Sequence, residues 1–147
     1  MTIDFSLKRA QKMGGLTIGL APGEYKRGGT PVENVYLSEK AFFFFEPAIR
    51  RCSAQYAGLF AHWGITPIPK EEWLMIVDNW KQVSVELASA QSINSVSEYA
   101  HISAELKEEF DDSFKANRSG LMATVSELEI WLEEVLKRYS VVSILGV

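Results

Sequence analysis

The sequence predicts a mainly α protein of the α+β class: a four-helix antiparallel bundle-like core with a small N-terminal β-hairpin or pair of short strands. In four long segments, apolar residues recur every three or four positions, the spacing that places side chains on one face of a helix. The connections between these segments are short, which favours antiparallel neighbours. Two short aliphatic and β-branched segments precede the first of them.

The composition indicates one folded domain. The chain has 147 residues, of which 47% are hydrophobic and 23% charged, as is usual for a globular protein that buries a core. We divide residues 1–147 into three parts: a short helix, strand and loop segment at 1–46, a helical core at 47–139 and an apolar tail at 140–147.

The N-terminal part contains one weak helix signal and two strand signals. Residues 3–13 place apolar side chains loosely on one side before Gly14-Gly15, which predicts a short helix. Residues 16–20 and 35–37 are short and aliphatic or β-branched, so each is expected to be a strand. The segment between them is rich in glycine and proline and is expected to be a loop.

Four consecutive phenylalanines at 42–45 have two interpretations. They form either a buried strand that leads into the next helix, or part of a helix that begins at Ser38 and kinks at Pro47. We prefer the strand, because proline disfavours the helical conformation at the preceding residue, Glu46.

The densest apolar stretch of the chain, 41–63, holds the first long helix. Pro47 suits the first helical position, and Gly64 suits the position after the last turn. Residues 66–69 then read as a rigid connector, and a second amphipathic helix is expected over about 70–90.

A third and a fourth helix follow. Ser95 with Glu98 forms a capping-box pattern, which predicts the start of the third helix, and 117–120 is expected to break it. The fourth helix is expected over about 121–139. The apolar tail 141–147 either docks on the core, pairs as a strand with the N-terminal segment, or crosses to another subunit.

Cysteine usage and hydropathy predict a cytoplasmic location. Cys52 is the single cysteine, so no internal disulfide forms, and a reducing compartment is the default. The N-terminus lacks an apolar segment of signal-peptide length, and no apolar run reaches the ~18 residues of a membrane span. We therefore expect no membrane association.

The net charge of −4 is unevenly distributed. Residues 1–70 hold nine basic and five acidic side chains, whereas residues 71–147 hold six basic and fourteen acidic ones. An acidic half disfavours nucleic acid, because phosphate contacts need Lys and Arg. It suits a basic protein partner, or it is simply a solvated surface whose charges pair with basic residues such as Arg50-Arg51.

No arrangement of residues indicates catalysis or metal binding. Glu98 and His101 have the Glu-x-x-His spacing of carboxylate-bridged metal bundles, but the other histidine, His62, lacks the matching glutamate. Cys52 lies on an apolar stripe, where an inert thiol is expected. We therefore predict no catalytic residues, no metal and no cofactor.

Two hypotheses for the function remain. The preferred one is a non-enzymatic binding protein, an acidic helical domain that binds or inhibits a macromolecular partner, as immunity proteins and antitoxins do. Its partner-binding residues would be Glu105, Glu108, Glu109, Asp111 and Asp112, extended by Glu129, Glu133 and Glu134.

The alternative is a small-molecule-binding protein or an enzyme with an aromatic pocket between helices. Tryptophan suits such a pocket because it combines a large apolar ring with one N–H donor. The pocket would be lined by His62, Trp63, Trp73 and Trp80. A homodimer is compatible with both hypotheses, because the tail 141–147 and the phenylalanine run offer apolar surface.

Overall fold

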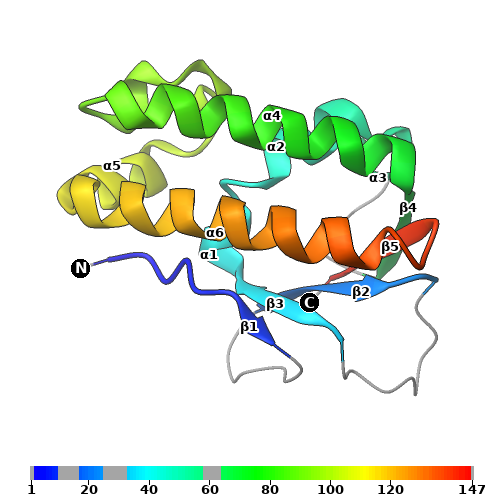
Figure 1. Ribbon diagram of the computed structural model, residues 1–147. Helices are drawn as coiled ribbons and strands as arrows, with labels where there is room; N and C mark the ends of the chain where they lie inside the picture. Colours follow the sequence, from blue (N-terminus) through cyan, green and yellow to red (C-terminus); the bar gives the residue numbers. More distant parts are fainter. Residues whose placement is uncertain (1, 10–16, 25–32, 58–63, 147) are drawn as a thin grey trace.

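A computed structural model describes residues 2–9, 17–24, 33–57 and 64–146. Within these ranges a twisted β-sheet lies on one side and the helices on the other (Figure 1). The strands are β1 Lys8–Arg9, β2 Thr17–Pro22, β3 Val35–Ser38, β4 Ile65–Pro69 and β5 Val141–Leu145. The helices are α1 Glu39–Phe42, α2 Glu46–Cys52, α3 Ala54–Ala57, α4 Lys70–Ser89, α5 Ala104–Asp112 and α6 Phe114–Val135, with 3₁₀ turns η1 Ile93–Ser95 and η2 Ser97–Tyr99.

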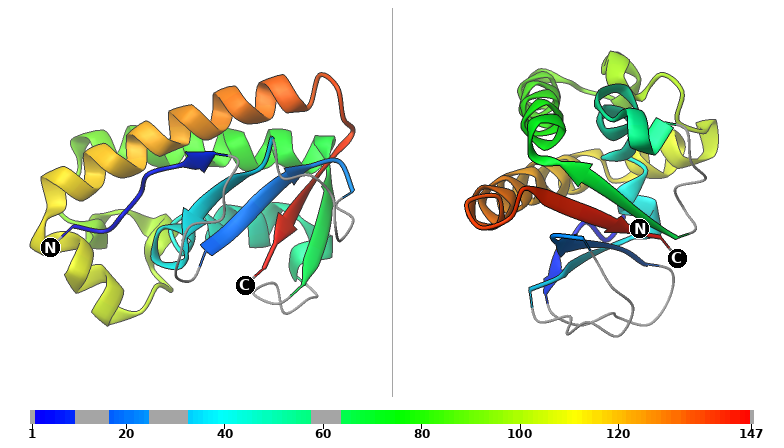
Figure 2. Two further views of the ribbon diagram at one scale, coloured as in Figure 1. Left: turned by 90° about the horizontal axis from the view of Figure 1, so that it is seen from below. Right: turned by 90° about the vertical axis from the view of Figure 1, so that its right-hand side faces the viewer.

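The expected four-helix bundle with a small β-hairpin is wrong. The two N-terminal strands exist as β2 and β3, but they belong to a five-stranded sheet of order β1-β3-β2-β5-β4, in which neighbouring strands are antiparallel. The C-terminal tail pairs as β5 with β2, one of the three alternatives considered for it. The supposed connector at 66–69 forms β4. Strands from all three expected parts of the chain therefore share one sheet (Figure 2).

The prolines of β4 are compatible with a strand because β4 lies at the edge of the sheet. Proline has no N–H to donate, so a strand rich in proline is tolerated where only one side is paired. Pro67 lies opposite Ser143 of β5, while Thr66 and Ile68 point into the core. The sequence does not show this burial by alternation of apolar and polar residues, because the buried positions hold Thr66 and Ile68 while Ile65 is exposed.

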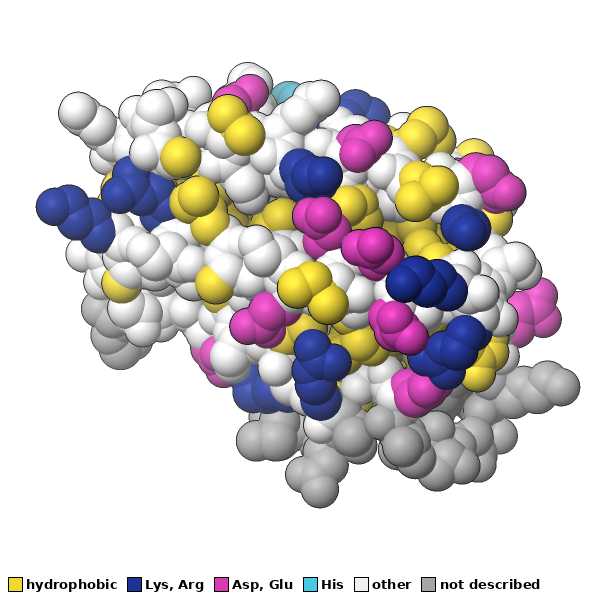
Figure 3. Space-filling model, in the orientation of Figure 1, with side chains coloured by type: hydrophobic (Ala, Val, Ile, Leu, Met, Phe, Trp, Pro, Cys, Tyr) yellow, Lys and Arg dark blue, Asp and Glu magenta, His cyan; other side chains and the backbone are white. Residues whose placement is uncertain are grey.

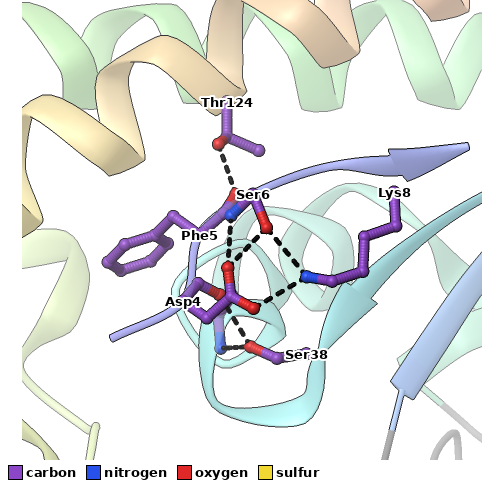
Figure 4. A network of polar contacts seen from close by, with 7 residues as sticks. Asp4, Phe5, Ser6, Lys8, Ser38 and Thr124 are labelled. Carbon is purple, nitrogen blue, oxygen red and sulfur yellow. Dashed lines mark hydrogen bonds and ion pairs between the residues drawn. The ribbon is translucent and has the colours of Figure 1, made fainter. Parts of the chain in front are cut away.

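Residues 2–7 are extended, so the short helix expected at 3–13 is wrong for its described part. Ile3 and Phe5 are buried while Asp4 and Ser6 are exposed, which is the period-two alternation of a strand. In Figure 4, Thr124 of α6 donates to the carbonyl oxygen of Phe5. These contacts hold the N-terminal segment along α6.

The preferred strand at Phe42–Phe45 is also wrong, and the alternative of a helix that begins at Ser38 and kinks at Pro47 is right only in its start, because α1 ends at Phe42. The Ser38 hydroxyl accepts a 3.2 Å hydrogen bond from the N–H of Ala41 and donates a 2.8 Å bond to the carbonyl of Asp4. A turn after Phe42 leads into α2, with Pro47 in its first helical turn. The backbone N–H groups of Phe44 and Phe45 donate to the carbonyls of Ala41 and Phe42, so the segment is closed by local turn hydrogen bonds.

The first long helix does not continue as expected from Pro47. Ser53, in extended conformation, ends α2, and its hydroxyl accepts a hydrogen bond from the N–H of Tyr56 at the start of α3. The remainder of that expected helix, residues 58–63, lies outside the described residues.

The break between the third and fourth helices also differs from the expectation. α6 begins at Phe114 and runs through 117–120, and the cap of α5 is Ser103 instead of Ser95. Asn117 is buried, and its amide donates a 2.9 Å hydrogen bond to the carbonyl of Phe110. Its side-chain oxygen accepts a 2.9 Å bond from the N–H of Ile3. This asparagine is a core residue with both ends satisfied, not a helix breaker.

The second helix agrees with the sequence. α4 covers Lys70–Ser89, and its buried residues are those of the apolar stripe. It runs beside α6, and the two helices pack their apolar faces together with the sheet into one core (Figures 1 and 2). Within the described ranges, no helix combines the length and the apolar character that crossing a bilayer requires.

Candidate functional site

A groove of about 810 Å³ lies between α2 and the segment that leads from η2 into α5. We call it the α2 groove. Its lining residues are Phe43, Glu46, Pro47, Arg50, Arg51, Ser97, Glu98, His101, Ile102, Ser103 and Leu106. Its volume lies within the range of ~300–1,000 Å³ that is typical of ligand-binding clefts.

The floor of the α2 groove is apolar. Phe43, Pro47 and Ile102 are partly buried, and Leu106 is almost wholly buried. Phe43 is the least buried of the four consecutive phenylalanines. The turn after α1 directs its ring to the groove, while the other three enter the core.

One wall of the groove carries a two-pronged ion pair. The guanidinium of Arg51 donates to both carboxylate oxygens of Glu98 at 2.6 and 3.0 Å, and to the side-chain oxygen of Asn79 at 2.6 Å. This confirms that Arg51 pairs with an acidic residue of the second half of the chain. It also means that the Glu98 carboxylate is already engaged beside His101.

A second polar cluster surrounds Glu46, which is buried. The Tyr56 hydroxyl donates to its carboxylate, and the Nε of Arg50 lies 3.4 Å from the other carboxylate oxygen. Burial, reinforced by the hydrogen bond to Glu46, raises the pKa of Tyr56 far above its ordinary value, so this phenol stays protonated. The cluster therefore holds a fixed donor and acceptor and does not present an activated nucleophile.

His101 lines the groove and is exposed. With Glu98 bound by Arg51, the Glu-x-x-His pair is not arranged as two ligands of one metal. Within the described residues, no three His, Cys, Asp or Glu side chains gather as metal ligands would.

The five acidic residues singled out at 105–112 all belong to α5, but they do not share one role. At about 100° per residue, Glu105, Glu108, Glu109 and Asp112 fall on one side of the helix, and Asp111 points about 120° away from Glu105. Asp111 accepts hydrogen bonds from the Ser92 hydroxyl at 2.6 Å and the Ile93 N–H at 2.9 Å. It is therefore a structural cap of η1.

The other four acidic residues of α5 differ in whether they form an ion pair. Glu109 forms a 2.8 Å ion pair with Lys40 of α1. Glu105, Glu108 and Asp112 are exposed, and none forms an ion pair with a described residue. We call these three residues the acid stripe. Glu105 directly precedes Leu106 of the groove floor on the same helix, although none of the three stripe residues lines the α2 groove.

The acidic residues at 129–134 lie elsewhere, on α6. Glu129 approaches Lys81 of α4 at 3.6 Å, and Glu134 approaches Lys137 at 3.8 Å. Glu133 lines a separate groove between α4 and α6. The structure does not place them with the acid stripe.

Two tryptophans of the alternative hypothesis, Trp73 and Trp80, lie in the core. Trp73 and Trp80 are buried, and their indole N–H groups donate to the carbonyls of Val142 and Phe45 at 3.1 and 3.0 Å. Neither lines the α2 groove. His62 and Trp63 lie outside the described residues, so an aromatic pocket that includes them stays a prediction.

Sequence reasoning missed the α2 groove itself. Its residues come from two segments, 43–51 and 97–106, that lie far apart in the sequence, and the Glu98/His101 spacing in the second segment pointed to a metal instead of a groove. The one available signal was the excess of apolar residues at 42–45, more than a single buried strand or helix face accommodates.

The chain matches no protein-family model, no curated protein and no solved structure.

Proposed function

We propose that this chain is a non-enzymatic binding protein, which holds a basic segment of a macromolecular partner along the acid stripe with an apolar anchor in the α2 groove. The observation that carries the proposal is the acid stripe. Three other acidic residues of the second half, Glu98, Glu109 and Glu129, are paired with Arg51, Lys40 and Lys81. The stripe differs from the exposed carboxylates that remain because its three members lie together on one side of a single short helix. Glu105, Glu108 and Asp112 are available to an external cation.

The only basic side chain of α5 does not neutralise the acid stripe. Lys107 donates to the backbone carbonyl of Ala100 at 3.0 Å. The stripe therefore presents three negative charges along a single helix. These charges attract cationic partners over roughly a Debye length of 8–10 Å.

The stripe and the groove would contribute differently to binding. An exposed ion pair contributes only ~0–1 kcal/mol, so the stripe would mainly speed association and select partners by charge. Burial of apolar surface contributes about 25 cal/mol per Å², so most of the affinity would come from a side chain seated over Phe43, Ile102 and Leu106. A small acidic protein that blocks a basic surface of its partner would act in this way, as immunity proteins and antitoxins do.

The proposal is tested with labelled amphipathic peptides that alternate leucine with arginine at helical spacing. Fluorescence anisotropy and stopped-flow mixing, at low and high ionic strength, compare the native chain with the triple variant E105Q/E108Q/D112N. Binding is expected to weaken with salt, and the triple variant should associate about tenfold more slowly. The control variant E71Q/E86Q/E127Q removes three exposed carboxylates from other helices and should bind like the native chain.

The groove is tested separately with Ile102→Ala. This change removes apolar contact without altering charge, so it should raise the dissociation rate about tenfold and leave the association rate nearly unchanged. The proposed function is wrong if the peptides do not bind the native chain. It is also wrong if they bind the control variant and the triple variant equally.

A further inference from the structure

A second groove, of about 540 Å³, runs between α4 and α6 on a different part of the surface from the α2 groove. We call it the α4/α6 groove. The face that carries α4 and α6 shows apolar side chains interspersed with side chains of both charges (Figure 3). The lining residues are Lys70, Leu74, Val77, Asp78, Lys81, Glu129, Leu132, Glu133, Leu136 and Lys137.

We propose that the α4/α6 groove is the surface through which two copies of this chain form a symmetric dimer. The apolar part centres on Leu74, which leaves 53% of its surface exposed and lies outside the buried stripe of α4. A large apolar side chain flanked by other lining leucines and ringed by charge is typical of the centre of a protein–protein contact.

The charges of the groove identify the occupant as a second copy. Three lysines and three carboxylates line it, so a partner of uniform charge would be repelled as much as it is attracted. Lys70 and Asp78 form no ion pair with a described residue of their own chain, although both border Leu74. A partner with the same mixed pattern, turned by half a rotation, satisfies both signs at once.

The order of the charges along α4 fits a two-fold axis through Leu74. Lys70 and Asp78 lie four residues before and four residues after it, on one i, i+4, i+8 ridge. In a two-fold contact, residue i of one copy meets residue j of the other, and j meets i. Two α4 helices that cross at Leu74 therefore bring Lys70 of each copy to Asp78 of the other.

Helix α6 and the turn after it repeat the opposite charges of this ridge but not its apolar centre. Glu129, Glu133 and Lys137 have the same four-residue spacing, with opposite signs at the two ends. Glu129 and Lys137 have ion-pair partners only at 3.6 and 3.8 Å, which leaves both able to reach across a contact. In the same contact Glu129 of each copy faces Lys137 of the other, whereas Glu133 lies at the middle of this ridge, so the apolar centre comes from α4 alone.

The dimer is tested by sedimentation equilibrium and light scattering over a concentration series. The native chain should form a dimer whose dissociation is concentration-dependent. Leu74→Glu should be monomeric at the same concentrations, with an unchanged circular dichroism spectrum. Met75→Glu is the matched control: Met75 is 49% exposed on the same helix, does not line the groove, and its variant should dimerise like the native chain.

The charge order is tested with K70E and D78K. Each variant alone places like charges opposite each other twice, so each should dimerise at least about tenfold more weakly. Mixed together, K70E and D78K restore two opposite-charge contacts and should form a heterodimer, as should the double variant K70E/D78K with itself. A monomeric native chain, an equal loss in M75E, or single variants that lose dimerisation without recovery in the mixture would overturn the proposal.

Discussion

The indole N–H of Trp73 donates a 3.1 Å hydrogen bond to the backbone carbonyl of Val142, and both residues are completely buried. This contact joins α4 to the C-terminal strand β5, which in turn lies between β2 and β4. One side chain therefore links the helical layer to a central strand of the sheet.

Replacing Trp73 with Phe should destabilise the protein by about 2–3 kcal/mol, since it leaves the Val142 carbonyl without this donor and creates a small cavity. Chemical unfolding in urea measures the loss. Trp80→Phe is the matched control, because its N–H bonds to Phe45 in a turn outside the sheet. Only the Trp73 variant should show faster hydrogen exchange in β5; equal exchange in the two variants would contradict the prediction.

Asn117→Leu should cost about 2–3 kcal/mol, although it makes the buried site more apolar. The variant removes the partner of the Ile3 N–H and of the Phe110 carbonyl, and a buried polar group without a partner is costly. Limited proteolysis should then cut the N-terminal segment faster. The same substitution at exposed Asn94 should change stability by less than ~0.5 kcal/mol; comparable losses at both positions would refute the assigned role.

Ser103→Ala should destabilise the protein by about 1 kcal/mol, because the Ser103 hydroxyl accepts the hydrogen bond of the Leu106 N–H at the start of α5. Ser95→Ala should have a smaller effect, since its hydroxyl only donates to the Ser92 carbonyl at an exposed position. Thermal unfolding of the two variants compares the sites directly. A larger loss of stability at Ser95 than at Ser103 would contradict this prediction and favour the capping box at Ser95 that the sequence pattern indicates.

The thiol of Cys52 should react slowly at neutral pH. Burial raises its pKa, and neighbouring Arg51 only partly opposes that effect. Because the thiolate is the reactive form, and a raised pKa lowers its fraction at a given pH, alkylation should keep accelerating above the ordinary thiol pKa of ~8.5. Iodoacetamide rates over a pH series test this, with the urea-unfolded chain as the reference. A folded-state rate that levels off at lower pH than the unfolded one would contradict it.

The sequence was sufficient for elements whose signal is local. The stripe of α4 needed only the 3.6-residue period, and β2 and β3 needed only their aliphatic and β-branched composition. For the candidate site, it identified the exposed carboxylates Glu105, Glu108 and Asp112 by charge density. It could not separate Asp111 from them, because that aspartate differs only in what it contacts. Its partners, the Ser92 hydroxyl and the Ile93 N–H, lie nineteen and eighteen residues earlier in the chain, and no local pattern predicts such a contact.

Tertiary structure alone decided the sheet and the groove. Whether Val141–Leu145 docks, swaps or pairs depends on the backbone groups that β2 and β4 leave open, and β4 was hidden by its prolines. The α2 groove exists because turns near Phe43 and Ile102 bring distant segments together. Periodicity is a property of neighbouring residues, whereas strand partners and surface hollows arise from contacts between residues far apart in the chain, where many pairings satisfy the same local pattern and only packing of the whole core selects one.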